Sequence, residues 1–185
     1  MSFSGILIAN RGEIAIRIAR AVSDLGIRSV AVFSSDDESS LHVIKSDECV
    51  LLPGKGAAAY LDVDSIISAA KINNCDAIHP GYGFLSEQAD FAKKCELEGV
   101  TFIGPKEKHL RLFGDKGAAR EAARSASVPV LNGINQPITL EEAESFFEGV
   151  KGSILVKAIA GGGGRGTRLV TKKSEVREAF ARCQA

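Results

Sequence analysis

Lys157 and the glycine-rich stretch after it are the residues of this chain best suited to bind a polyphosphate. Lys157 ends an apolar run, and Gly161, Gly162, Gly163, Gly164, Arg165 and Gly166 follow shortly after it. Glycines let backbone N–H groups approach an anion closely and permit the positive φ angles that such a loop needs. A phosphate-binding loop is favoured over a flexible linker, because no serine dilutes the run and strand-like residues flank it.

The spacing of Gly161 and Gly166 matches a P-loop, but the residues that follow do not. A P-loop requires Lys and then Ser or Thr directly after its last glycine, at the start of a helix. Here Thr167 and Arg168 follow, and the next residues are typical of a strand. A glycine-rich hairpin between two strands is suited instead to close over a ligand as a lid.

Three cations could contribute to phosphate binding at this loop. Lys157 follows the apolar strand 154–156, so we expect its ammonium in the mouth of a cleft, where a desolvated cation needs an anionic partner. Lys116 stands at a predicted helix start, where the helix dipole disfavours a cation, and this suggests a use outside the helix. Either lysine could instead be an ordinary surface residue. Arg165 could bind phosphate oxygens or only keep the loop soluble.

A second motif, His79-Pro80-Gly81-Tyr82-Gly83-Phe84, leads from a predicted strand end into a helix for which Ser86 is the expected N-cap. Ligands of open parallel sheets bind beyond the carboxyl ends of the strands, and this motif follows such a strand end. Because no second His or Cys lies at metal-ligand spacing, a hydrogen-bonded core position is favoured for His79 over a metal site. Tyr82 could pack against neighbours or face a substrate. Surface or half-buried positions are expected for His42 and His109.

Alternating strands and helices must position these residues. The apolar patterns predict strands at 6–9, 29–33, 49–52, 76–79 and 100–103, and helices at 13–25, 63–72 and 87–97. Gly26 is the expected stop of the first helix. The alternation predicts an α/β fold: an open, Rossmann-like parallel sheet with helices on both faces and right-handed crossovers.

The first turn of this sheet does not suit a dinucleotide. A dinucleotide-binding turn needs Gly-x-Gly-x-x-Gly, whereas residues 10–13 offer only Gly12 and put Glu13 where a pyrophosphate would lie. NAD and FAD are therefore disfavoured.

The pattern changes after Pro105, in a way typical of the beginning of a second domain. Helices are predicted at 106–113, 115–127 and 139–147, strands at 153–156 and 169–170, and a last helix with Ser174 as N-cap. The domain boundary is expected between residues 113 and 114. Because no return strand follows the last helix, we expect the sequence to continue in the native protein.

Composition favours a globular chain with a small anionic ligand. The 185 residues include 23 basic and 23 acidic side chains and 45% hydrophobic residues, with no basic run to indicate nucleic acid or an anionic membrane. Four scattered cysteines argue against zinc and disulfides, and buried thiols of a reducing compartment are expected at Cys49, Cys75, Cys95 and Cys183. No leader or membrane-spanning run is found, so a cytoplasmic location is expected.

Five segments in order resemble biotin carboxylase, the ATP-dependent component of biotin-dependent carboxylases. They are residues 8–15, 79–87, 102–105, 114–116 and the loop from Gly161, and the resemblance extends in register over the whole chain. The resemblance implies an amino-terminal α/β domain at 1–113 and the beginning of an ATP-grasp domain at 114–185, with a lid at 161–166. It also implies a ligase in which ATP phosphorylates bicarbonate and carboxyphosphate delivers CO2 to biotin on a carrier.

The resemblance also assigns residues, cofactors and partners. Lys116 and Lys157 match ATP-contacting lysines, Gly162 to Gly166 match the lid over the phosphates, and Tyr82 and Gly83 match a stretch near the biotin and bicarbonate pocket. ATP, Mg2+ and biotin are implied, with a biotin carboxyl carrier domain, a carboxyltransferase and a homodimer. The family's magnesium ligands and bicarbonate-activating residues lie downstream of Ala185. We therefore expect no metal ligand in this chain and no turnover by these 185 residues alone.

Some residues depart from the family's usual pattern. Ile159 and Ala160 replace a Ser and a Gly, and Thr167 replaces a Met, so the nucleotide geometry could differ. Other ATP-grasp ligases, such as carbamoyl phosphate synthetase or glycinamide ribonucleotide synthetase, share the architecture but lack the segments at 8–15 and 79–87. A non-catalytic assembly or interaction fragment is the alternative of a different class. The final carboxyl acceptor, an acyl-CoA, pyruvate, urea or another compound, depends on a transferase outside this chain.

Overall fold

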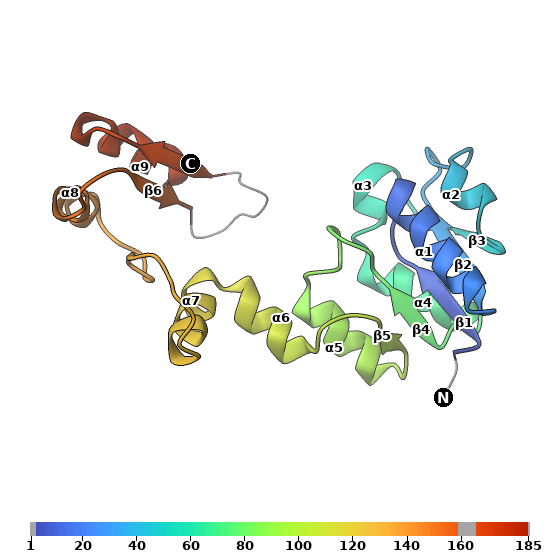
Figure 1. The fold of residues 1–185 in the computed structure, drawn as a ribbon. Helices are drawn as coiled ribbons and strands as arrows, with labels where there is room; N and C mark the ends of the chain where they lie inside the picture. The colour runs from blue at the N-terminus through green and yellow to red at the C-terminus, as the bar shows by residue number, and fades with distance from the viewer. Residues whose placement is uncertain (1–2, 159–165, 185) are drawn as a thin grey trace. The chain divides into compact units, whose positions relative to one another are not determined.

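A five-stranded parallel sheet forms the first of two units in this chain (Figure 1). The structure is a computed structural model that describes residues 3–158 and 166–184. The units are Met1–Gly114 and Asp115–Ala185. The sheet has the order β3-β2-β1-β4-β5 with all neighbours parallel, which confirms the predicted open parallel sheet. Its strands are β1 (Gly5–Ile8), β2 (Arg28–Phe33), β3 (Glu48–Leu51), β4 (Ala77–His79) and β5 (Thr101–Phe102).

Helices cover both faces of this sheet, as the alternating pattern predicts. Leu7 packs on one face with Ile66 and Phe91 of α4 and α5, while Ile6 and Ile8 pack on the other with α1. This opposition follows from the two-residue period of a strand. The helices of this unit are α1 (Gly12–Asp24), α2 (Leu41–Ile44), α3 (Gly56–Ala59), α4 (Val63–Ile72), α5 (Ala89–Leu97) and α6 (Glu107–Gly114).

Two helix ends show what the sequence pattern does and does not determine. Gly26 follows α1 with a φ of 68°, so the expected glycine stop is confirmed. Ser86, in contrast, is not the N-cap of α5, because the helix starts at Ala89 after Gln88. Gly83 and Phe84 have positive φ angles, and Ser86 N donates to Gly83 O at 2.9 Å. The chain therefore makes a further turn before the helix begins.

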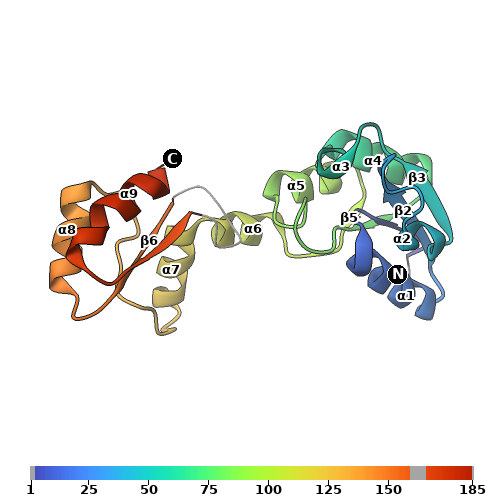
Figure 2. The same ribbon diagram turned by 90° about the horizontal axis from the view of Figure 1, so that it is seen from above.

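The second unit is an antiparallel hairpin packed against helices (Figure 2). Ile154 and Val170 of the hairpin form its core with Ala143, Val176 and Ala179. Ser174 is not an N-cap, since it lies within a 3-10 turn in which Glu175 accepts from the N–H groups of Thr171 and Lys172. The elements are α7 (Lys116–Ser125), α8 (Leu140–Gly149), β6 (Ile154–Lys157), β7 (Thr167–Val170), η1 (Lys173–Glu175) and α9 (Val176–Gln184).

The cysteines differ in exposure, so the expectation of four buried thiols is wrong. Cys49 is exposed because it lies on β3 at the edge of the sheet, and Cys183 is partly exposed. Cys75 and Cys95 are buried, and burial raises the pKa of Cys75 to about 11 and that of Cys95 to about 12. Within residues 3–158 and 166–184, no helix is long and apolar enough to cross a membrane.

Candidate functional site

A small pocket lies where β1 ends and the turn after β4 begins. It has a volume of about 340 Å³, and residues 10–14 and 82–84 line it. The Tyr82 side chain is 60% exposed, and its hydroxyl donates to the carboxylate of Glu13. This hydrogen bond raises the pKa of Tyr82 and lowers that of Glu13. Tyr82 is therefore exposed rather than packed into the core.

His79 holds the start of the same turn. Its Nδ1 accepts a hydrogen bond from Gly81 N at 3.0 Å, which requires a ring nitrogen without a proton. Burial lowers the pKa of His79 and so favours this neutral form. The ring is half-buried and hydrogen-bonded, in agreement with the interpretation favoured from the sequence.

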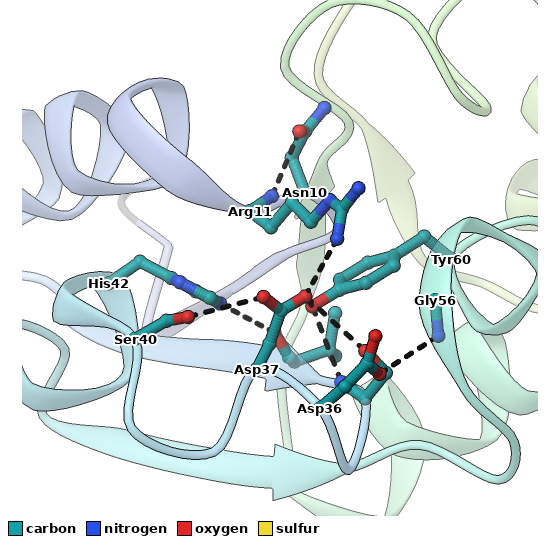
Figure 3. Close-up of polar contacts among 10 residues, drawn as sticks. Asn10, Arg11, Asp36, Asp37, Ser40, His42, Gly56 and Tyr60 are labelled. Carbon is teal, nitrogen blue, oxygen red and sulfur yellow. Dashed lines mark hydrogen bonds and ion pairs between the residues drawn. The ribbon is translucent and has the colours of Figure 1, made fainter.

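Arg11 borders the pocket and is fixed by the carboxylate of Asp37 (Figure 3). Its Nη1 lies 3.1 Å from Asp37 Oδ2, and its guanidinium lies over the rings of Tyr60 and Phe84 at 5.5 and 5.8 Å. The Tyr60 hydroxyl donates to the same Asp37 oxygen at 2.8 Å, and Ser40 Oγ donates to Oδ1 at 3.2 Å. Asp37 thus connects the ends of β1 and β2 with the residue that follows α3.

The protonation state of Asp37 follows from these partners. Burial acts to raise the pKa of its carboxyl, but hydrogen bonds from Tyr60, Arg11 and Ser40 outweigh burial and hold the pKa below its usual value. The pKa of Tyr60 is raised to about 12, chiefly by burial and then by the hydrogen bond to Asp37. Near neutral pH the group is therefore an ionised carboxylate that accepts from a neutral phenol and a guanidinium.

His42 lies beside this group and is buried, so the expectation of a surface or half-buried position is wrong. Only 1% of it is exposed, because α2 packs against β2 and directs His42 Nε2 to Val32 O at 3.3 Å. Its Nδ1 has no hydrogen-bond partner in the part of the chain that the structure describes. Burial lowers the pKa of His42, so the neutral ring is favoured.

Three residues of this site were not predicted from the sequence: Asn10, Asp37 and Tyr60. One signal was present: the polar run from Ser34 to Ser40 directly follows a buried strand, at the sheet edge where ligands bind. Tyr60 had no such signal, because its contact with Asp37 depends on how the segment after β3 folds back.

The hairpin of the second unit presents Lys157 on its uncovered face. Leu155 pairs with Leu169 and Lys157 pairs with Thr167, so the two-residue period places these four side chains on one face. Leu155 is 50% and Leu169 65% exposed, whereas Ile154 and Val170 on the opposite face are buried. Lys157 is exposed, and the expectation that it lies within a cleft is wrong for the described residues. Among the described residues of this unit, helices α8 and α9 pack against the opposite face, which carries Ile154 and Val170.

Gly166 closes the base of the glycine loop. Its φ is 75°, its carbonyl accepts from Ala158 N at 2.8 Å, and a Cβ at this position would lie 2.9 Å from the Ala158 Cβ. This glycine therefore adopts the positive φ that glycine permits, and a side chain at this position would crowd Ala158. The other residues of the predicted lid lie outside the described residues: Gly161, Gly162, Gly163, Gly164 and Arg165.

Lys116 is exposed in the first turn of α7. Asp115 caps this helix by accepting from Ala118 N at 2.8 Å, and its carboxylate offsets the unfavourable position of a cation there. Lys116 and Lys157 thus belong to different elements of the second unit, whereas Tyr82 and Gly83 belong to the first unit.

These features define an α/β domain with a pocket beside the carboxyl ends of β1 and β4, followed by a hairpin that contains the glycine-rich segment. Residues 2–110 match the family described as "Biotin carboxylase, N-terminal domain". The chain belongs to the biotin carboxylase family. Residues 115–185 match the family described as "Carbamoyl-phosphate synthase L chain, ATP binding domain", so the second unit is the beginning of an ATP-grasp domain.

Two relatives show how much of a longer protein the chain resembles. It is 53% identical to pyruvate carboxylase of Bacillus subtilis over 188 aligned residues, which cover 100% of this chain and 16% of the relative. It is 45% identical to biotin carboxylase of Haemophilus influenzae, covering 97% of this chain and 41% of the relative. The chain therefore spans less than half the length of either protein.

Solved structures of biotin carboxylases are also similar to this chain. The biotin carboxylase domain dimer of Hydrogenobacter thermophilus 2-oxoglutarate carboxylase, a complex with MgADP, ADP and bicarbonate, superposes with a TM-score of 0.93. It is 38% identical, and the match covers 99% of this chain and 41% of that one. A biotin carboxylase complex with β,γ-ATP from Campylobacter jejuni has a TM-score of 0.92 and 36% identity, and the match covers 99% of this chain and 42% of that one.

Proposed function

We propose that this chain is the amino-terminal part of an ATP-dependent biotin carboxylase. ATP would phosphorylate bicarbonate, and the resulting carboxyphosphate would deliver CO2 to a ureido nitrogen of biotin on a carrier domain. The observation that carries the proposal is the exposed hairpin face, on which a lysine stands at the start of a glycine loop beside two leucines. The match of the preceding unit to biotin carboxylase supports it.

The hairpin face provides two kinds of contact for a nucleotide. Leu155 and Leu169 offer an apolar surface to the base, and the Lys157 ammonium is available to the phosphates at the same face. Lys116 would contribute a second positive charge, and Gly162 to Gly166 with Arg165 would close over the phosphates. Backbone N–H groups and ammonium groups would together offset the charge that moves as the γ-phosphoryl group is transferred.

The pocket of the first unit would face biotin and bicarbonate. Tyr82 supplies an exposed phenol, and Gly83 lets the backbone turn with a φ of 65° without a side chain in the way. Arg11 adds a guanidinium already oriented by Asp37. Of these residues, Tyr82 and Gly83 are the ones that the resemblance to biotin carboxylase assigns to this pocket.

Mg2+ is proposed to bind outside the residues of this chain that the structure describes. Among residues 3–158 and 166–184, no group of three or more His, Cys, Asp or Glu side chains could hold a metal ion. We propose that Mg2+ accompanies ATP and is held by residues downstream of this chain. When bound, it would neutralise phosphate charge.

Partners follow from the same assignment. The proposed activity needs a biotin carboxyl carrier domain and a carboxyltransferase, which would set the final acceptor. A homodimer is proposed because the Hydrogenobacter thermophilus relative is described as a biotin carboxylase domain dimer. A cytoplasmic location is proposed for the protein.

Replacement of the two lysines tests the proposal in a complete carboxylase that contains these residues. Lys157→Ala and Lys116→Ala are each expected to lower bicarbonate-dependent ATP hydrolysis by about 10-fold or more, because an electrostatic contact with the transferred group is lost. The exposed Lys151, in the same unit, provides the matched control Lys151→Ala. Unchanged ATP affinity and rate in both test variants would remove these lysines from the site.

The isolated chain gives a second test. Residues 1–185 alone are expected to show no biotin-dependent turnover, because the proposed magnesium and bicarbonate groups lie elsewhere. Turnover above that of the Lys157→Ala chain would contradict this expectation.

A further inference from the structure

Asn10 is buried directly beneath the turn that carries Tyr82 and Gly83. Only 2% of it is exposed, and both polar atoms of its side chain are hydrogen-bonded. Its Nδ2 donates to Pro80 O at 2.7 Å and to Tyr82 O at 2.8 Å, and its Oδ1 accepts from Arg11 N at 2.9 Å. One amide thus joins the end of β1 to a turn about 70 positions later in the chain.

We infer that Asn10 and His79 form a clamp that positions Tyr82 for its ligand, with Asn10 as the principal positioning residue. The clamp consists of these two side chains and the backbone of Pro80, Gly81 and Tyr82. Asn10 donates to the carbonyl groups on either side of Gly81, while His79 accepts from the N–H of Gly81 itself. Three consecutive residues of the turn are therefore fixed by His79, which ends β4, and by Asn10, which lies two residues after the neighbouring strand β1.

The three contacts of Asn10 require a short side chain that carries both donors and an acceptor, which is an amide. Both carbonyl groups need a donor, and the Arg11 N–H needs an acceptor. An Asp would place acceptor oxygens against two carbonyl oxygens, and a Leu would leave all three backbone groups without a partner. The residue type is therefore explained by the turn above it.

Gly81 provides the space that the Asn10 amide occupies. Its φ is 66°, and a Cβ added there would lie 2.7 Å from Asn10 Nδ2. The left-handed conformation turns the carbonyl groups of residues 80 and 82 toward one amide, and the missing side chain leaves room for it. Gly99 has a similar φ of 72° but no atom within 4 Å of such a Cβ, so it provides a matched control.

The clamp fixes the backbone of Tyr82 and thereby the position of its phenol in the pocket. The Tyr82 carbonyl is held by Asn10, and the hydroxyl of the same residue donates to Glu13 in the first turn of α1. Release of the carbonyl would free the turn and separate the phenol from Glu13. The relevance of this to biotin and bicarbonate rests on the function proposed above, but the clamp itself does not.

The pKa of Tyr82 reports the clamp directly, because the chain has only two tyrosines and no tryptophan. We would label the tyrosine Cζ atoms with 13C, follow their NMR shifts with pH, and assign them with Tyr82→Phe. In Asn10→Ala, the pKa of Tyr82 is expected to fall to the value measured in Glu13→Gln. Asn73→Ala removes another amide that donates to a backbone carbonyl, Ala69 O at 2.8 Å, and is expected to leave Tyr82 unchanged.

Tyr60 serves as the internal measure of folding, because burial raises its pKa to about 12. A folded Asn10→Ala chain with an unchanged Tyr82 pKa would overturn the inference. Should Asn10→Ala unfold the chain, Gly81→Ala replaces it and Gly99→Ala is its control. A Tyr82 pKa that is lowered in Gly81→Ala but not in Gly99→Ala supports the clamp. Equal Tyr82 pKa values in the two glycine variants overturn it.

A separate measurement tests the underlying function. In a complete carboxylase that contains these residues, Tyr82→Phe and Asn10→Ala are expected to raise the KM for free biotin more than they lower kcat. An unchanged biotin KM in Tyr82→Phe would count against the proposed pocket only. A lowered Tyr82 pKa in Asn10→Ala would still establish the clamp.

Discussion

Arg11 Nη1 lies 3.1 Å from Asp37 Oδ2, an ion pair that joins residues at the ends of β1 and β2. Because Tyr60 and Ser40 also donate to this carboxylate, removal of Asp37 leaves several groups without their acceptor. The pair therefore connects the stability of the first unit to the shape of the pocket beside Arg11.

Asp37→Ala is expected to lower the free energy of unfolding of the chain by about 1–3 kcal/mol at pH 7, since a partly buried hydrogen-bonded ion pair is lost. The exposed neighbour Glu38 provides the control Glu38→Ala, which should change it by less than about 0.5 kcal/mol. Urea denaturation followed by circular dichroism measures both. Equal losses in the two variants would contradict the role given to Asp37.

The contribution of Asp37 is expected to depend on pH. Its pKa in the folded chain lies below the usual value of 3.8, so its stabilising effect is complete above that value. The effect is lost as the pH falls through the lowered pKa. The difference between wild type and Asp37→Ala should therefore shrink in acid, and a difference that grows there would have the wrong sign.

Val170 and Leu169 are adjacent but lie on opposite faces of the hairpin, which makes them a matched pair. Val170 is fully buried, so Val170→Ala should reduce the stability of the second unit by about 1–3 kcal/mol. Leu169→Ala should change it by less than about 0.5 kcal/mol. Hydrogen exchange of the β6 and β7 backbone amides measures the effect. A larger loss from Leu169→Ala would mean that the other face is covered.

His42 and His79 should make the first unit less stable in mild acid. Burial lowers the pKa of both rings below 6.5 in the folded chain, so their stabilising contribution is complete above pH 6.5 and is lost as the pH falls through the folded values. Urea denaturation between pH 7.5 and 5.5 should show a falling free energy of unfolding. The slope should be smaller in His42→Asn and in His79→Asn. A flat profile in the wild type would contradict the prediction.

The thiols should differ strongly in reactivity. Cys49 is exposed, whereas Cys75 and Cys95 are buried with pKa values of about 11 and 12. Under native conditions a disulfide reagent should modify Cys49 at least about 100-fold faster than these two, because the thiolate is the reactive form. Because Cys183 is partly exposed, the comparison uses a Cys183→Ser background. In that background Cys49→Ser should abolish the fast phase and Cys75→Ser should leave it in place, and a fast phase that survives Cys49→Ser would refute the assignment.

Local patterns in the sequence were sufficient to predict most strands and helices of the first unit. Continuous apolar runs predicted the five strands, and the helical periodicity predicted α1, α4 and α5. Gly26 marked a helix end because glycine adopts a positive φ without a steric penalty. The short helices α2 and α3 were not predicted, since four residues are too few for a periodic signal. Ser86 was misassigned because an N-cap type also occurs in turns.

The sequence by itself determined the alternating elements, the glycine loop beside Lys157 and the motif of residues 79–84, because each depends on neighbouring residues. Tertiary structure alone decided that Asp37 meets Arg11, that Asn10 lies beneath Tyr82, and that His42 is buried. It also decided that Lys157 stands on the exposed face of its hairpin. These outcomes depend on strand order and on which face a helix covers, and no local period contains that information.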